Sequence, residues 1–220
     1  TYNGRKLRLR SIHSEKLTEK NVAEELKGVD GVIVAPGFGS RGIDGKLVTL
    51  RYTREHNIPT LGICLGMQCM VIEFARNVLG WTDAHTTEID PTTTHKVVDL
   101  MEEQKSISDL GGSMRLGGYD CILRPGSKIA AAYGSDFIRE RHRHRFEFNS
   151  QYRENYEQAG MLCAGENPDT GLVETVELRD HRWYVGVQYH PEYRSTVLHP
   201  SPLFMAFVKE AISYGRENRD

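Results

Sequence analysis

Residues 61–68 read LGICLGMQ and place one cysteine, Cys64, two positions after one glycine and two positions before another. The apolar residues 59–63 predict a short strand, and residues 67–79 have the spacing of a helix that packs along one side. A nucleophile between a strand and a helix needs a strained backbone, and neighbouring glycines remove side chains that would clash there. The stretch therefore predicts a nucleophile on a sharp turn, with its sulfur near the positive helix end that would stabilise a thiolate.

A histidine and a glutamate follow another apolar stretch much later in the chain. Residues 183–189 predict a strand that leads into His190, Pro191 and Glu192. Side chains at positions i and i+2 of a strand lie on one face, and Pro191 cannot donate to a sheet ladder, so regular pairing ends there. Alone, Cys64 could be a buried structural residue and His190 a histidine bound to a carbonyl. Together with Glu192 they have the composition of an activated-thiol triad.

The composition is that of one soluble globular domain. The chain has 220 residues, of which 39% are hydrophobic and 26% are charged, and its net charge is -2. These values allow one sizeable core and give no general attraction to nucleic acid or anionic lipid. No apolar run approaches the roughly 18 residues that a membrane-spanning helix needs. The four cysteines lack metal-ligand spacing, and no signal peptide is visible, so we expect a cytoplasmic protein with no metal site.

Strands and helices alternate along the first part of the chain, which predicts an α/β fold with a largely parallel central sheet flanked by helices. Catalytic residues of such sheets gather at the carboxyl ends of the strands. Residues 83–113 are polar and rich in turn formers. The predicted elements are, in order, a strand at 6–12, a helix at 18–26, a strand at 29–35, a helix ending near 55, the strand before Cys64 and its helix, short strands up to 188, and a helix at 204–212.

A thiolate that attacks a carbonyl creates an oxyanion, which backbone N–H groups must stabilise. The loss of one such donor costs about 3 to 4 kcal/mol. The amide of Leu65, which follows the nucleophile, is the expected first donor, and the glycine-rich loop 36–39, PGFG, can supply the second. Considered alone, Gly37 in that loop would be an ordinary turn residue.

Together these motifs resemble the class I glutamine amidotransferases, whose Cys-His-Glu glutaminase domains release ammonia from glutamine. Further stretches are similar to the C-terminal glutaminase domains of the CTP synthase family, and the similarity covers nearly all of the chain. It implies the flavodoxin-like α/β fold of that class. The stretches are PGFGSRG at 36–42, Thr87 with Glu88, GGSMRLG at 111–117 and RERHRHRFE at 139–147.

The resemblance implies a role for each matching residue. Cys64 would be the nucleophile, His190 the general base and then acid, and Glu192 the carboxylate that orients the histidine. A free amino acid requires a carboxylate for its ammonium group and a guanidinium for its carboxylate. Without the resemblance, Glu88 would be a solvated loop acid and Arg145 part of a charged strand. The implied glutamine contacts are Gly37, Leu65, Gly66, Met67, Gln68, Glu88 and Arg145.

The resemblance also implies a longer polypeptide. In the family, an ATP-dependent synthetase domain precedes the glutaminase domain, which itself begins with a further strand and helix. We expect residues 1–220 to form one amidotransferase domain without these parts. In the complete enzyme the ammonia would aminate UTP to CTP, with ATP and magnesium as cofactors, GTP as activator and a homotetramer as the assembly. Residues 111–118 match a lid that the family links to GTP.

Two further features concern the glycine-rich residues 36–47. Relatives commonly read Pro-Gly-Gly-Phe-Gly where this chain has PGFG at 36–39, so the loop is one glycine shorter. Residues 39–47 do not have the glycine spacing of a phosphate-binding loop, and no cofactor is expected in this domain.

Two other functions fit parts of the sequence. The arginine-rich residues 139–145 could contact nucleic acid phosphates, but acidic residues interrupt the run and the chain is slightly acidic. His142 and His144 could suggest a metal, but the guanidinium groups between them repel a cation. The enzymatic alternative is another cysteine hydrolase, such as a γ-glutamyl hydrolase or a small peptidase. Glu88 with Arg145 would suit free glutamine better than a peptide.

Overall fold

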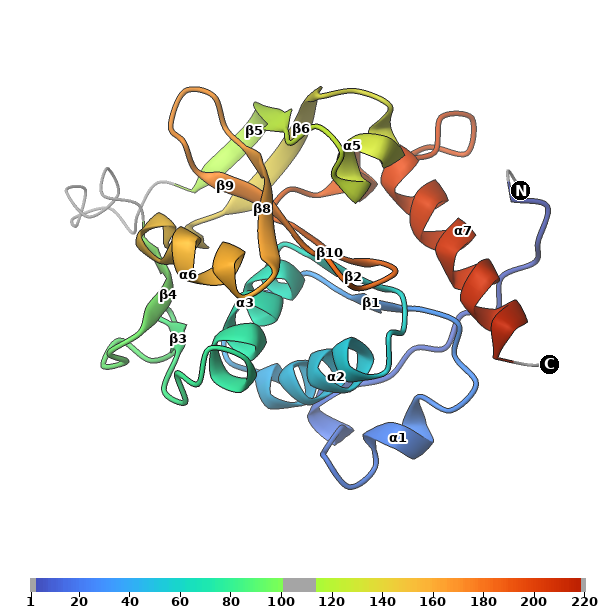
Figure 1. Ribbon diagram of the computed structural model, residues 1–220, viewed down its shortest axis with the longest axis horizontal. Helices are drawn as coiled ribbons and strands as arrows, with labels where there is room; N and C mark the ends of the chain where they lie inside the picture. The colour runs from blue at the N-terminus through green and yellow to red at the C-terminus, as the bar shows by residue number, and fades with distance from the viewer. Residues whose placement is uncertain (1–2, 101–113, 219–220) are drawn as a thin grey trace.

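The computed structural model describes residues 3–100 and 114–218, and within them a seven-stranded sheet has the strand order β1-β2-β10-β9-β8-β5-β6. The α/β class is confirmed, because helices lie on both faces of this sheet (Figure 1). The strands are β1 (Val32–Val34), β2 (Thr60–Ile63), β5 (Arg115–Leu123), β6 (Phe137–His144), β8 (Met161–Glu166), β9 (Val173–Leu178) and β10 (Tyr184–Val187).

Within the central sheet, parallel pairing is confined to the strands that carry the site. β1, β2 and β10 pair in parallel, whereas β10 with β9, β9 with β8, β8 with β5 and β5 with β6 are antiparallel. The sheet is therefore mixed. The connections from β8 to β9 and from β9 to β10 are too short for the crossover helix that parallel neighbours need.

The remaining elements surround this sheet. A second sheet of the described residues has the order β3-β4-β7 and lies beside α3, at the lower left of Figure 1. Its strands are β3 (His85–Thr86), β4 (Lys96–Leu100) and β7 (Phe146–Phe148). The helices are α1 (Val22–Glu25), α2 (Ile43–Glu55), α3 (Leu65–Asn77), α5 (Lys128–Tyr133), α6 (Arg153–Gln158) and α7 (Pro202–Glu217), with short 3₁₀ helices η1 (Ser14–Lys16), η2 (Ser150–Tyr152) and η3 (Pro191–Tyr193).

The core has one cluster on each face of the central sheet. Leu61 and Ile63 of β2 point toward the cluster that contains residues of α5 and α7. Gly62, between them, faces α3 instead, and a Cβ there would lie 2.8 Å from Met70 Sδ. This close approach holds the start of α3 against the carboxyl end of β2, where the site is built.

Two expectations from the sequence require correction, and a third falls partly outside the described residues. Residues 6–12 do not form a strand, and Leu7 and Leu9 are 56% and 90% exposed, because alternation produces a strand only where a neighbouring strand pairs with it. The helix expected at 18–26 is reduced to α1. Residues 115–118 of the proposed lid belong to β5 and pair with β6, while residues 111–113 lie outside the described residues.

None of the helices in residues 3–100 and 114–218 is long and apolar enough to cross a lipid bilayer.

Candidate active site

Cys64 lies at the junction of β2 and α3 with a left-handed backbone, φ 52° and ψ -106°. Side chains other than glycine rarely adopt this region, and a nucleophile elbow is one of the places where they do. The glycines on both sides are required by packing. A Cβ on Gly66 would lie 2.2 Å from Val34 O, and one on Gly62 would lie 2.8 Å from Gly66 O. The turn predicted from the sequence is therefore present, and its two glycines are required because a side chain at either position would clash with neighbouring backbone atoms.

β10 delivers His190 to the same end of the sheet. It pairs with β2 so that Val187 is opposite Ile63, and the amide of Cys64 donates to Val187 O at 2.7 Å. His190 follows Val187 by three positions, and its amide donates to Arg141 O of β6 at 2.8 Å. Cys64 and His190 thus come from neighbouring strands, although far apart in the sequence.

The imidazole of His190 is held in a defined orientation. Its Nδ1 is 2.6 Å from Glu192 Oε1, and its ring stacks on Tyr193 with centroids 4.7 Å apart. Pro191 opens the short helix η3 that brings Glu192 back to the histidine. Among the described residues, the buried Nε2 of His190 has no hydrogen-bond partner. With Nδ1 bound to a carboxylate, Nε2 is the nitrogen that can accept a proton.

Burial dominates the ionisation of the nucleophile. It raises the pKa of the Cys64 thiol to about 12, the amide of Leu65 hydrogen-bonds the sulfur and lowers the pKa, and the charges of Glu147, Glu192 and Glu88 raise it further. The Leu65 amide at the helix end lowers the pKa of Cys64, as expected, but burial raises it by more. Cys64 is therefore a thiol, and it must lose its proton to a base before it attacks.

The shortened loop at residues 36–39 lies against the elbow. A Cβ on Gly37 would be 3.3 Å from Leu65 Cδ2, so the loop backbone passes close to the residue expected to donate the first oxyanion hydrogen bond. Phe38 is 54% exposed, and the guanidinium carbon of Arg143 lies 5.7 Å from its ring centroid. The loop is thus placed between the elbow and β6.

The two candidate substrate clamps have exposed side chains. Glu88 follows β3, its amide donates to Thr86 Oγ1 at 3.3 Å, and its charge affects the pKa of Cys64. Arg145 lies between β6 and β7. Glu88 is therefore electrostatically coupled to the nucleophile, and Arg145 stands at the end of a strand next to the site.

Two other predicted contact residues point into the protein. Met67 is 1% exposed, and its Cγ is 3.0 Å from the position that a Cβ on Gly186 would occupy. Gln68 Nε2 donates to Phe146 O at 2.9 Å and to Gln188 Oε1 at 3.3 Å. The side chains of Met67 and Gln68 therefore support the site, and the groups of this turn that remain for a ligand are backbone amides.

Gln188 was not identified from the sequence. Its Nε2 donates to Cys64 Sγ at 3.7 Å, and its side chain is fully buried. Gln188 directly follows β10 and stands two residues before His190, and this spacing is the signal that could have placed both side chains on one face.

Arg139, Arg141, Arg143 and Arg145 form one exposed row, because the buried residues of β6 alternate with them. Arg139 pairs with Asp120 at 2.7 Å.

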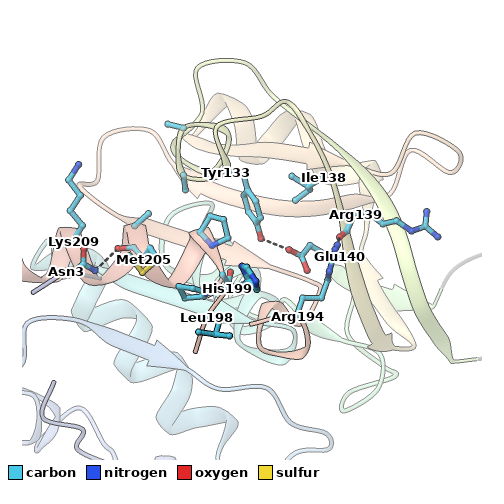
Figure 2. Close-up of a pocket in the computed structure, with 16 residues that line it drawn as sticks. Asn3, Tyr133, Ile138, Arg139, Glu140, Arg194, Leu198, His199, Met205 and Lys209 are labelled. Atoms are coloured by element: carbon cyan, nitrogen blue, oxygen red, sulfur yellow. Dashed lines mark hydrogen bonds between the residues drawn. The ribbon is translucent and has the colours of Figure 1, made fainter. Parts of the chain in front are cut away.

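Beside β6, a cavity of about 910 Å³ lies between α5, β6 and α7 and includes none of the triad residues. Figure 2 shows Tyr133 and Glu140 at its wall, where the Tyr133 hydroxyl donates to Glu140 Oε1 at 3.0 Å. Within the described ranges, no group of three or more His, Cys, Asp or Glu side chains could hold a metal ion.

Comparisons with known proteins agree with this geometry. The sequence pattern of the family described as "Glutamine amidotransferase class-I" matches residues 2–210. The glutaminase domain of Trypanosoma brucei CTPS, solved with bound acivicin, superposes with a TM-score of 0.91 at 36% identity, over 96% of this chain and 83% of that one.

Curated relatives are more similar in sequence but longer. CTP synthase of Porphyromonas gingivalis is 68% identical over 219 residues, which are 100% of this chain and 41% of that protein. CTP synthase of Bacteroides thetaiotaomicron is 61% identical over 212 residues, or 96% of this chain and 40% of its own length. The chain thus spans about two fifths of these relatives. These similarities agree with the fold, the elbow and the triad of this chain. Together they show that the chain belongs to the class I glutamine amidotransferases, as a glutaminase domain of the CTP synthase type.

Proposed function

We propose that this chain hydrolyses L-glutamine to glutamate and ammonia through a thioester on Cys64. The observation that carries the proposal is a buried thiol on a left-handed elbow after β2, while the parallel neighbour β10 leads to a histidine whose Nδ1 is 2.6 Å from Glu192. The Nε2 of that histidine has no partner among the described residues. This arrangement supplies a nucleophile, a base and the group that orients the base.

The chemistry follows from these groups. His190 Nε2 takes the thiol proton as the sulfur attacks the side-chain amide carbon of glutamine, and the amide oxygen becomes an oxyanion held by the Leu65 amide and the Gly37 loop. The C–N bond then breaks while the histidine returns the proton to nitrogen, which releases ammonia. A water molecule, deprotonated by the same histidine, attacks the thioester, and glutamate leaves as the thiol recovers its proton.

Recognition of a free amino acid is assigned to exposed charges of opposite sign. Glu88 would bind the α-ammonium group and Arg145 the α-carboxylate, since a carboxylate and a guanidinium are the natural partners of those groups. An ordinary peptide lacks this pair of free α-groups, whereas the γ-glutamyl group of a γ-glutamyl hydrolase substrate keeps both. The pair therefore favours glutamine over a peptide, and the family membership favours it over a γ-glutamyl substrate.

The relatives' name suggests what happens to the ammonia. We infer that, in a longer protein such as the CTP synthase of P. gingivalis, this domain feeds a synthetase part that aminates UTP to CTP with ATP and magnesium. GTP as activator, a homotetramer and a cytoplasmic location are further parts of this proposal. The described residues themselves contribute the glutaminase reaction.

The decisive test is glutamate release from glutamine by the purified protein and by its Cys64→Ala and Cys64→Ser variants. Both substitutions should abolish release while the circular dichroism spectrum and the melting temperature are preserved. Turnover that persists in Cys64→Ala would refute the proposal. Hydrolysis of a γ-glutamyl peptide at a higher kcat/KM than glutamine would instead support the γ-glutamyl hydrolase alternative.

A further inference from the structure

Five ionisable side chains close a ring inside the protein, next to the candidate site. Arg115 Nη1 is 3.2 Å from Glu147 Oε1, and Arg115 Nη2 is 2.7 Å from Glu174 Oε1. His144 Nδ1 is 3.4 Å from Glu147, His142 Nε2 is 3.6 Å from Glu174, and the two histidines meet at 2.8 Å between Nδ1 and Nε2. We call Arg115, His142, His144, Glu147 and Glu174 the buried ionic ring.

The ring joins four strands. Arg115 begins β5, both histidines are on β6, Glu147 is on β7 and Glu174 is on β9. Their side chains are between 0% and 5% exposed. β5, β6 and β9 belong to the central sheet and β7 to the small one, so the ring fastens the two sheets to each other beside β10.

Burial changes the charges that the ring carries. It lowers the pKa of His142 to about 2 and that of His144 to about 3, and it raises the pKa of Glu174 to about 7 and that of Glu147 well above its usual value. Buried ion pairs add little net stability, because desolvation offsets their attraction, and apolar replacements are often as stable. Stability alone is therefore a weak reason for five such residues to occupy this position.

The ring surrounds the backbone that presents Arg145. His144 immediately precedes Arg145 and Glu147 follows two residues later, and their side chains contact each other across the turn. On the other side of this turn, Phe146 O accepts from Gln68 Nε2, which also contacts Gln188, and Gln188 donates to Cys64 Sγ. The position of Arg145 is thus fixed to the nucleophile by one chain of contacts and to the central sheet by the ring.

From this arrangement we infer that the buried ionic ring is a positioning device for Arg145, and that it sets how tightly the α-carboxylate of the substrate is held relative to Cys64. This inference rests on the proposed glutaminase function and assigns a role to residues that touch neither the substrate nor the sulfur. His144 is a neutral member of the ring, so its replacement removes no charge near Cys64. Because it acts through Arg145, its loss should weaken substrate binding and leave the thiol chemistry unchanged.

The test is a double-mutant cycle of His144→Leu and Arg145→Ala with glutamine as substrate. His144→Leu should raise KM about tenfold and change kcat less than about threefold, because a displaced binding group costs binding rather than chemistry. In the Arg145→Ala background, the same substitution should change KM less than about twofold. An equal increase of KM in both backgrounds would overturn the inference, as would an unchanged KM in a folded His144→Leu protein.

Two controls separate positioning from general damage. His181 is also a buried histidine, 6% exposed, but it lies outside the ring and contacts Thr53 O. His181→Leu should lower the melting temperature without changing KM. His144→Gln keeps a donor that can reach His142 and should recover part of the lost affinity. If His144→Leu does not fold, Glu174→Gln takes its place under the same criteria, since it changes one charge and preserves shape.

A second measurement does not depend on turnover. Iodoacetamide lacks an α-carboxylate, so His144→Leu should leave its rate of reaction with Cys64 unchanged. A glutamine analogue in which a chloromethyl ketone replaces the side-chain amide retains the α-carboxylate and should react more slowly with the variant. Equal slowing by both reagents would mean that the ring supports the thiol rather than Arg145. Glutamine hydrolysis that survives in Cys64→Ala would instead refute the proposed function itself.

Discussion

Gly66→Ala tests the structural basis of the elbow. The new Cβ would lie 2.2 Å from Val34 O and 3.1 Å from Val34 C, both of which are backbone atoms of β1. Neither atom can turn away as a flexible side chain would, so the start of α3 and the end of β1 must separate by about 1 Å. Overpacking of this kind costs about 1–3 kcal/mol, and the upper end is expected here.

The expected consequences are measurable in two ways. For a chain of this size, a loss of about 3 kcal/mol lowers Tm by roughly 6–12 °C, which differential scanning calorimetry would detect. Gly66 also lies between Cys64 and the bulk of α3, so displacement of the Leu65 amide should lower kcat/KM for glutamine by about a hundredfold.

Gly118→Ala is a suitable control for this substitution. A Cβ there would meet only the side chain of Arg139, at 3.3 Å or more, and stability should stay within about 0.5 kcal/mol. The explanation of the elbow glycines would be refuted if Gly66→Ala had the Tm and kcat/KM of the unaltered protein.

Three further outcomes are expected. Glu192→Ala should chiefly lower kcat for glutamine, because His190 loses the carboxylate 2.6 Å from its Nδ1, and steady-state kinetics would contradict this role if only KM changed. Arg145→Ala should chiefly raise KM, and a variant with normal KM but low kcat would assign the arginine to the chemistry instead. Burial lowers the pKa of His181 to about 4 from its ordinary 6.5, so the folded state resists its protonation, and the stability present above pH 6.5 should be lost as pH falls toward 4. His181 contributes about 3 kcal/mol to the free energy of unfolding in this way. Urea titrations should therefore show that His181→Gln loses less stability between pH 6.5 and pH 4 than the unaltered protein. An equal loss in both proteins would mean that other groups cause the acid sensitivity.

The local geometry of the site could be predicted from the sequence because it depends on neighbours in the chain. Glycines on both sides of Cys64 are required by steric clashes within one turn, and the spacing of His190 and Glu192 around a proline fixes their contact. A helix ending near residue 55 and a strand before Cys64 were likewise predictable, and they correspond to α2 and β2. In each case the interactions that decide the structure are local.

What could not be predicted depends on which strands become neighbours. Gln188 contacts Cys64 only because β10 pairs with β2, and the buried ionic ring forms because β5 lies beside β6 while β9 lies close enough to contribute Glu174. Alternation gave residues 6–12 the pattern of a strand but no sheet edge accepts them. The raised pKa of the Cys64 thiol could not be predicted for a similar reason, since burial by distant segments outweighs the effect of the helix end.

The central claim is that a glutamyl group is carried by Cys64 during turnover, and mass spectrometry can test it directly. Protein mixed with glutamine and quenched in acid should yield a peptide with a glutamyl adduct on Cys64, and the other buried cysteines, Cys69, Cys121 and Cys163, should be unmodified. The adduct should be absent from Cys64→Ala. Rapid release of glutamate with no adduct on Cys64, or with the adduct on another cysteine, would contradict the account.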